Sequence, residues 1–423
     1  MLTFIYMAYS MMGLLLETVP VFEDTWIECL GDLARYRMAI EDECLRDRET
    51  WTVVSRGWYK KASDKQPSVG RLYHHLAILA RPSAIRQLFY YSKSLCVEIP
   101  FEAGRDSMMT LINPILEQNS SQASTVPPID LAFVQCHGVM FSRKKPDMLS
   151  TAMAEFLGLL DNCIGRAARD WLEPGHLIGI ANCCAVVGYG FVGNPIWTTI
   201  KPQRDADAED PPPAEDEADT RTSQDLANAL QLANKTHDVV LRRFGDPNVL
   251  SYFHVTLVFM NYLTSRPEAI PHMAPSFPWK LAALMLNTLL SECRTEQYPR
   301  IEGKVFPRPE EEDELQPRPL PEDWALRGLV WAADNFPSGW FSNDKLDEDE
   351  RHFEIASHAG KRKERVLYLG CQIAAKSSEY LRYDSQVHQF NVSPQYDIDV
   401  NPMHISPADS SDLGELPDAP AAA

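Results

Sequence analysis

Four amphipathic segments near the start of the chain point to a helical fold more strongly than any other feature of the sequence. Between residues 26 and 95, large apolar side chains recur every three or four positions, which is the spacing of one face of a helix. The same periodicity continues along the rest of the chain, broken by short connections that contain Pro or Gly. No strand-rich region is visible. We therefore predict an all-α fold.

Two of these segments are related by an internal repeat. Trp58 and Lys60 are matched by Tyr91 and Lys93 at an offset of 33 residues. This offset is close to the roughly 34-residue period of tetratricopeptide-type helix pairs. Because one such pair cannot bury its apolar face alone, further helices must stack on it. The expected architecture is a stacked array of helix pairs and helical hairpins, an α-solenoid.

The charge of the chain is unevenly distributed. The formal net charge is −19 over 423 residues, and most of the excess acid lies in the ranges 203–225, 308–323 and 391–423. The range 56–93, by contrast, holds eight Lys or Arg residues and a single acid, Asp64. A locally basic repeat pair in an acidic protein suits an anionic partner. A solvated helix face has the same composition, and both interpretations stay open.

The nine cysteines include no Cys-x-x-Cys pair and lie in apolar runs, as Cys183 and Cys184 do. This usage predicts reduced, buried thiols and a nuclear or cytoplasmic protein. Residues 1–16 are apolar, but they lack a basic start and are shorter than the about 20 residues that a membrane span needs. We therefore predict a bundle helix there and no membrane partner.

The sequence shows no motif of a catalytic site. It has no glycine-rich phosphate loop, no nucleophile elbow, and no His and Cys set at zinc-ligand spacing. We expect a protein that is not an enzyme and that carries no metal or cofactor.

Six sequence blocks together resemble one family. The first three are GDLARYR at 31–37, WYKKASDKQPSVGRLYHHLAILA at 58–80 and FYYSKSLCVEIPFEA at 89–103. They resemble the telomerase-associated ever-shorter-telomeres proteins and the Smg adaptors of nonsense-mediated mRNA decay. Three later blocks, LPEDWALRG, NFPSGWF and RKERVLYLGCQIA, resemble the nucleic-acid-binding helical domain of the fungal branch. The resemblance covers residues 25–392. Some members of this family end in a PIN nuclease domain, but this sequence ends in a short acidic segment instead.

The resemblance implies a phosphate site in a remnant of a 14-3-3-like bundle. In such folds an Arg-Tyr pair behind Gly-Asp helps to hold a phosphate, which assigns that role here to Arg35 and Tyr36. His74 stands where the family has an asparagine, and the resemblance places it beside them. The residues alone also allow a simple intrahelical contact of Asp32 with either Arg35 or Tyr36, worth about 0.2–0.5 kcal/mol.

Basic residues in two regions are the candidates for contacting a nucleic-acid backbone. Interleaved aromatics such as Trp58 and Tyr73 could stack on bases, although the same residues are typical of a repeat core. The predicted nucleic-acid-binding residues are Lys60, Lys61, Lys65, Arg71, Arg86 and Lys93 in the repeat pair, and Arg327, Lys361 and Arg362 in the second half.

Composition divides the chain into five regions. The resemblance implies that the first of these regions is a truncated 14-3-3-like and tetratricopeptide-like domain at 1–117. We expect helical-hairpin regions at 127–200 and 225–390, the second with an acidic loop at 299–319. An acidic disordered linker at 201–224 and a disordered tail at 391–423 complete the map.

The sequence predicts a non-enzymatic helical adaptor that binds RNA, single-stranded DNA or phosphorylated protein tails, together with other decay or telomerase subunits. A pure protein–protein scaffold without nucleic-acid binding is the alternative. We expect localisation in the nucleus, the cytoplasm or both.

Overall fold

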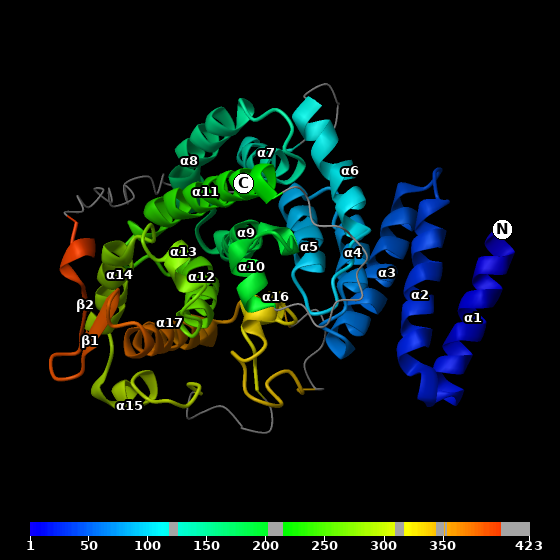
Figure 1. The fold of residues 1–423 in the computed structure, drawn as a ribbon. Helices are drawn as coiled ribbons and strands as arrows, with labels where there is room; N and C mark the ends of the chain where they lie inside the picture. Colours follow the sequence, from blue (N-terminus) through cyan, green and yellow to red (C-terminus); the bar gives the residue numbers. More distant parts are fainter. Residues whose placement is uncertain (118–125, 202–214, 309–316, 344–350, 352, 399–423) are drawn as a thin grey trace, which may run out of the picture.

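The computed structural model describes residues 1–117, 126–201, 215–308, 317–343, 351 and 353–398, without the side chains of residues 215–222. The described chain is mostly helical, which confirms the predicted fold class (Figure 1). A 14-3-3-like character of the first helices stays a prediction.

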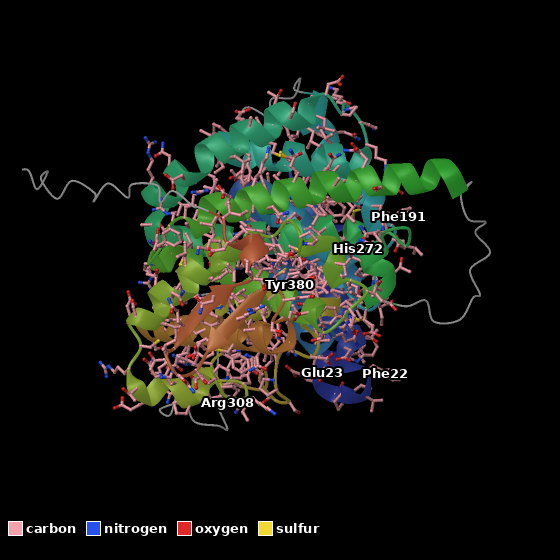
Figure 2. The ribbon with its side chains drawn as sticks, turned by 60° about the vertical axis from the view of Figure 1, so that its left-hand side comes forward. Phe22, Glu23, Phe191, His272, Arg308 and Tyr380 are labelled. Carbon is pink, nitrogen blue, oxygen red and sulfur yellow. The ribbon has the colours of Figure 1, made fainter. Side chains whose placement is uncertain are left out.

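The N-terminal helices pack side by side in chain order, from α1 to α5. They lie where the apolar periodicity predicts helices: α1 (Leu2–Thr18), α2 (Glu23–Ala39), α3 (Leu45–Lys65), α4 (Gly70–Leu79) and α5 (Ala84–Leu95). The outer face of α1 is apolar and open to solvent, with Phe4 64% and Leu14 61% exposed. Phe22, at the turn between α1 and α2, also lies at the surface (Figure 2).

No single helix in the described part of the chain is long and apolar enough to cross a membrane. The pair formed by α1 and the segment up to Ala39 passes the same test of length and composition, but it is bent by 111°.

The middle of the chain wraps a central buried helix. The elements are α6 (Gly104–Glu117), α7 (Pro128–Ser142), α8 (Met148–Ala167), α9 (Leu172–Val186) and α10 (Pro195–Ile200). α9 is buried on nearly every side, because α5, α11 and α12 all pack on it. Asn194 starts α10 by accepting hydrogen bonds at 3.0 Å from the amides of Ile196 and Trp197.

The C-terminal elements continue the row with α12 on α9 and α17 on α12. They are α11 (Glu215–Leu241), α12 (Leu250–Thr264), α13 (Ile270–Met273), α14 (Trp279–Ser291), α15 (Tyr298–Ile301), α16 (Pro321–Leu326), α17 (Ala356–Lys376), β1 (Leu381–Asp384) and β2 (Gln389–Val392). Short 3-10 turns connect several of them, including Ala168–Trp171 before α9 and Val330–Ala332 after α16. In Figure 1, α1–α3 and the β-hairpin lie at opposite ends of the molecule.

Three predicted boundaries need correction. The sequence of residues 361–383 predicts one basic-led helix, but α17 ends at Lys376, and an antiparallel hairpin follows that pairs Leu381 with Val392. The predicted disordered tail therefore begins too early, because β2 includes Asn391 and Val392; residues 399–423 lie outside the described residues. The predicted linker at 201–224 overlaps α11, which begins at Glu215, and its residues 202–214 also lie outside.

The buried apolar side chains form two separate cores. The smaller one joins α2, α3 and α4 through Ile27, Tyr59 and Leu76, and the larger one fills the space from α5 to the β-hairpin. The boundary between these two cores is where basic, acidic and aromatic side chains meet.

Candidate anion-binding pocket

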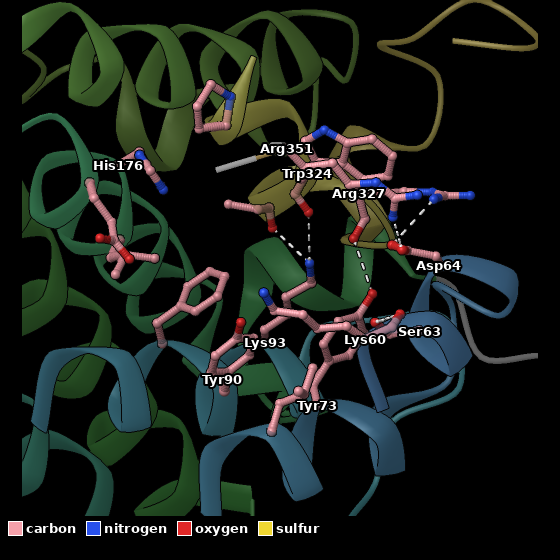
Figure 3. A pocket seen from close by; sticks show the side chains of 16 residues that line it. Lys60, Ser63, Asp64, Tyr73, Tyr90, Lys93, His176, Trp324, Arg327 and Arg351 are labelled. Carbon is pink, nitrogen blue, oxygen red and sulfur yellow. Dashed lines mark hydrogen bonds and ion pairs between the residues drawn. The ribbon is translucent and has the colours of Figure 1, made fainter. Parts of the chain in front are cut away.

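A pocket of about 90 Å³ opens at the boundary between the two cores (Figure 3). We call it the junction pocket. Its walls come from α3, α4, α5, α9 and α16, and from Arg351. Four cationic side chains line it against two carboxylates: the cations are Lys60, Lys93, Arg327 and Arg351, and the acids are Asp64 and Glu173.

Helical spacing brings the lining residues of the repeat pair together. Lys60 and Asp64 are four residues apart and share one face of α3, and Phe89 and Lys93 do the same on α5. Tyr73 adds an aromatic wall from α4. The repeat pair therefore presents a basic and aromatic floor.

The opposite wall is a segment from far along the chain, residues 320–330. Gly328 lies with φ +90° so close to Pro67 that a Cβ atom would stand 1.9 Å from the carbonyl oxygen of Pro67. Next to it the amide of Val330 donates to the carbonyl of Cys96 at 3.2 Å. Only glycine allows this approach, and it places α16 over the repeat pair.

Lys93 is the most buried cation of the pocket, with 2% of its surface exposed. Its Nζ donates to the main-chain carbonyl of Ala325 at 2.7 Å and lies 4.3 Å from the centre of the Tyr73 ring. Among the described residues no carboxylate lies within ion-pair distance of this amine. Burial and the neighbouring Arg327 lower the pKa of Lys93 to about 7.

Asp64 takes up part of the positive charge. Arg351 forms a hydrogen-bonded ion pair with one of its oxygens, and Arg327 lies 3.6 Å from the other. Burial raises the pKa of Asp64, against the opposing effect of Arg351 and Arg327. The second carboxylate, Glu173, accepts two hydrogen bonds from the Arg86 guanidinium, at 2.7 and 2.8 Å. Positive charge therefore remains in excess inside the pocket.

Trp324 adds a hydrogen-bond donor that the described residues do not use. Its indole Nε1 is buried and has no partner there. The Arg351 guanidinium lies 4.5 Å from the ring and Phe341 contacts it edge-on at 4.9 Å. A buried donor without an acceptor is costly, so this group favours an acceptor-rich ligand.

The structure brings together three of the basic residues predicted from the sequence and separates the rest. Lys60, Lys93 and Arg327 line the junction pocket, although the sequence assigned them to two patches. Three others pair with acids at the surface: Lys65 with Glu23 and Asp24, Arg71 with Glu28, and Arg86 with Glu173. Lys61 is exposed beside Trp58, and Lys361 is half-buried on α17.

Two residues predicted as backbone contacts are buried and need correction. Lys93 lies behind α16, and Arg362 is 2% exposed and bound by Glu322 and Glu354 at 2.5–2.9 Å. Neither can reach a phosphate backbone running over the surface. For the exposed basic residues, nucleic-acid contact stays a prediction.

The predicted phosphate site is partly occupied by the chain itself. Arg35 donates to Asp32 at 2.9 Å, which is the intrahelical contact that the residues alone allowed. It also donates to the Tyr59 hydroxyl of α3 at 3.2 Å. Tyr36 is 50% exposed, with the Arg35 guanidinium 4.7 Å from its ring centre. His74 is 8% exposed, and burial lowers its pKa, so it is neutral near pH 7. Phosphate binding by these three residues stays a prediction.

Sequence reasoning missed two important residues of the junction pocket. Trp324 stands in the block LPEDWALRG, which was noted for its resemblance but not for a binding role. Arg351 follows an acidic run and has no pattern that marks it. Among the described residues, no group of three or more His, Cys, Asp or Glu side chains is arranged to hold a metal ion.

Comparison with known proteins confirms the family resemblance. Residues 55–169 match the family model described as the Est1 DNA/RNA binding domain. A stretch of 126 residues is 30% identical to nonsense-mediated mRNA decay factor SMG7 of Danio rerio, covering 29% of this chain and 10% of that protein. A stretch of 85 residues is 33% identical to telomerase-binding protein EST1A of Danio rerio, covering 20% of this chain and 5% of that protein. The alignments thus span a small part of these relatives.

The fold resembles a chain in the crystal structure of Est1 and Cdc13. The TM-score is 0.58 at 12% sequence identity, and the match covers 88% of this chain and 71% of the other. The similarity extends over most of the described helices and concerns the fold alone.

Proposed function

We propose that this chain is a non-enzymatic helical adaptor. Its residues 55–169 match the Est1 DNA/RNA-binding domain family, and parts of the chain are related to SMG7 and EST1A. Its junction pocket binds an anionic group of a partner, in the nucleus, the cytoplasm or both. The relatives named as decay and telomerase-binding factors support the adaptor role.

One observation carries this proposal: cations from distant parts of the chain converge on one enclosed pocket where positive charge is in excess. Elsewhere in the described chain the predicted basic residues mostly meet acids of the chain itself, as Lys65 and Arg71 do. An exposed, neutralised pair contributes little to binding. A buried amine such as Lys93 gains far more from an anion, because water screens the interaction less.

The direct test is calorimetric titration of the full chain with inorganic phosphate. We expect saturable binding that Lys93→Met weakens by about tenfold or more, the usual effect of losing a charged hydrogen bond. Lys61→Met is the matched control, because Lys61 is exposed on the same helix as Lys60 and does not line the pocket. Absent binding, or equal binding by both variants, contradicts the proposal. Melting curves verify that both variants are folded.

A second candidate function is binding of single-stranded nucleic acid, which the matched family model favours. Each phosphate neutralised on a single strand contributes about −0.7 to the slope of log affinity against log salt, so three or four contacts give roughly −2 to −3. Reversal of Lys60, Lys61 and Arg71 to Glu should then abolish binding of a fluorescent oligonucleotide. Salt-independent or undetectable binding leaves the protein adaptor standing alone.

A further inference from the structure

A second cavity adjoins the junction pocket and has the opposite charge. It has a volume of about 520 Å³, and we call it the acidic recess. It shares the lining residues Glu173, His176 and Pro321 with the junction pocket, so the two cavities are neighbours. Four carboxylates line the recess against two guanidinium groups; the acids include Asp170, and also Glu173, which binds Arg86.

The negative charge of the recess is built into a buried trio. Glu322 and Glu354 both bind the single guanidinium of Arg362, at 2.5–2.9 Å. Both carboxyls are ionised, because Arg362 holds the pKa of Glu354 at about 2 and that of Glu322 well below its usual value, against the opposing effect of burial. Two carboxylates share one cation, so one negative charge stays uncompensated within the trio. His254 completes the contacts of Glu322 at 3.1 Å.

Asp170 adds a negative charge at the edge of the recess. It lies exposed in the 3-10 turn before α9 and makes no ion pair among the described residues. The neighbouring Arg169 donates instead to the main-chain carbonyl of Glu354. Asp170 is therefore an exposed carboxylate of the recess, whereas Glu322 of the trio is fully buried.

We call the two neighbouring cavities together the trough; the junction pocket is its positive end and the acidic recess its negative end. His176 lies where they meet, and burial lowers its pKa, so it adds no charge near pH 7. A nucleic-acid backbone is anionic throughout, and the negative end repels it. A peptide that carries an acidic and a basic side chain matches both ends. Leu177 of the pocket and Leu172 of the recess, with Pro321 shared by both, supply apolar surface for its backbone and stems.

We propose that the trough binds a peptide segment of a partner protein that places an acidic side chain in the junction pocket and a basic side chain in the acidic recess. The inference rests on the proposed function and names its partner. The carboxylate or phosphoryl group contacts Lys93, Lys60 and the free indole donor of Trp324. The basic side chain faces Asp170 and the trio of Glu322, Arg362 and Glu354.

The test uses Gly-Ser peptides on the full chain, measured by fluorescence anisotropy. One series carries a Glu and a Lys at every spacing up to one helical turn, a second carries two Glu, and a third carries two Lys. We expect one spacing of the mixed series to bind about tenfold more tightly than either like-charged series. An oligonucleotide of single-stranded RNA that competes better than every mixed peptide overturns the inference.

A charge reversal makes the test specific to the recess. Asp170→Lys should weaken the mixed peptide and strengthen the peptide with two Glu, so that their ranking inverts. Glu155→Gln is the control, because Glu155 is an exposed acid on α8 that lines neither cavity. If Lys93→Met abolishes phosphate binding but Asp170→Lys leaves the peptide ranking unchanged, the inference fails and the proposed function survives.

Discussion

Lys93 on α5 donates a hydrogen bond of 2.7 Å to the main-chain carbonyl of Ala325, which lies 232 residues further along the chain. The contact fastens α16 to the repeat pair. It also closes the junction pocket over a positive charge that no carboxylate of the described residues contacts. One side chain thus joins the two cores and prepares the site for an anion.

The charge of Lys93 should make stability depend on pH in a distinctive way. Its pKa falls from 10.5 to about 7 on folding, so the unfolded chain binds more protons between these values and stability rises with pH across that range. Lys93→Met removes this slope. Urea unfolding of both proteins from about pH 6 to 10 should show that the free energy of unfolding of the wild-type chain increases relative to that of the variant as the pH rises.

The comparison between the two proteins isolates Lys93 from its titratable neighbours. The other titratable groups near this amine are present in both proteins, so their contributions to the pH dependence of stability largely cancel in the difference. They are Asp64 and Lys60 on α3, Tyr73 on α4, Cys184 on α9 and Arg327 after α16. A stability difference that does not change over this pH range contradicts the assignment.

Gly328→Ala should destabilise the protein, because alanine is strained at φ +90° and its Cβ would overlap the carbonyl of Pro67. We expect a loss of about 1–3 kcal/mol or more by denaturant unfolding. The control is Gly360→Ala in α17, where nothing lies within 4 Å of the added Cβ. Alanine there should raise stability by roughly 0.5–1 kcal/mol, because it favours the helix. Equal effects at the two sites would show that the 320–330 segment is not held as described.

Glu322→Gln should be among the most damaging single substitutions, because it breaks a fully buried ion pair with Arg362. Removing one partner of such a pair costs about 3–5 kcal/mol. The control is Lys363→Ala, on the same helix as Arg362, which removes the ion-pair partner of Glu292. Because Glu292 is exposed, this substitution should lower the free energy of unfolding by no more than about 1 kcal/mol. A cost of Glu322→Gln within that smaller range would contradict a buried, ionised trio.

The same trio predicts acid sensitivity. The pKa of Glu354 is lowered to about 2 in the folded protein, so its stabilisation is complete above its ordinary pKa of 4.5 and is lost as the pH falls toward 2. In thermal melts between about pH 5 and 2.5, the melting temperature of the wild-type chain should therefore fall more steeply with decreasing pH than that of Glu354→Gln. Parallel curves for the two proteins count against this origin of acid sensitivity.

Arg35→Ala separates the two predicted anion sites. If Arg35 and Tyr36 hold a phosphate, the substitution should weaken a phosphoserine peptide far more than an oligonucleotide, because one guanidinium is a larger share of a small site. Arg46→Ala, an exposed arginine on α3, is the control. Peptide binding untouched by Arg35→Ala leaves only the structural role seen in its bonds to Asp32 and Tyr59.

The sequence predicts the helices well because their apolar periodicity is a local property. The buried position of α9 agrees with its apolar composition, and α1 covers the apolar residues 1–16 for which a helix is predicted. The β-hairpin was missed even though Leu381 and Tyr383 alternate with polar residues, because each strand has only four residues.

The site could be predicted only in part, because its geometry depends on contacts between distant residues. The basic character of Lys60 and Lys93 was visible, but the burial of Lys93 depends on Ala325 and on the close approach of Gly328. The fate of Arg362 depends likewise on Glu322, forty residues away. No local pattern distinguishes such residues from exposed cations.

The position of the 320–330 segment ties binding to cooperativity. The walls of the junction pocket come from α3, α4, α5, α9 and α16, so they meet only after the chain has closed a loop of more than 200 residues. An occupant would by mass action favour the state in which both cores are docked, and it would make them unfold as one unit. The repeat pair alone would lack the pocket walls that α9, α16 and Arg351 supply. Occupancy of the pocket therefore reports that the chain has closed this long loop.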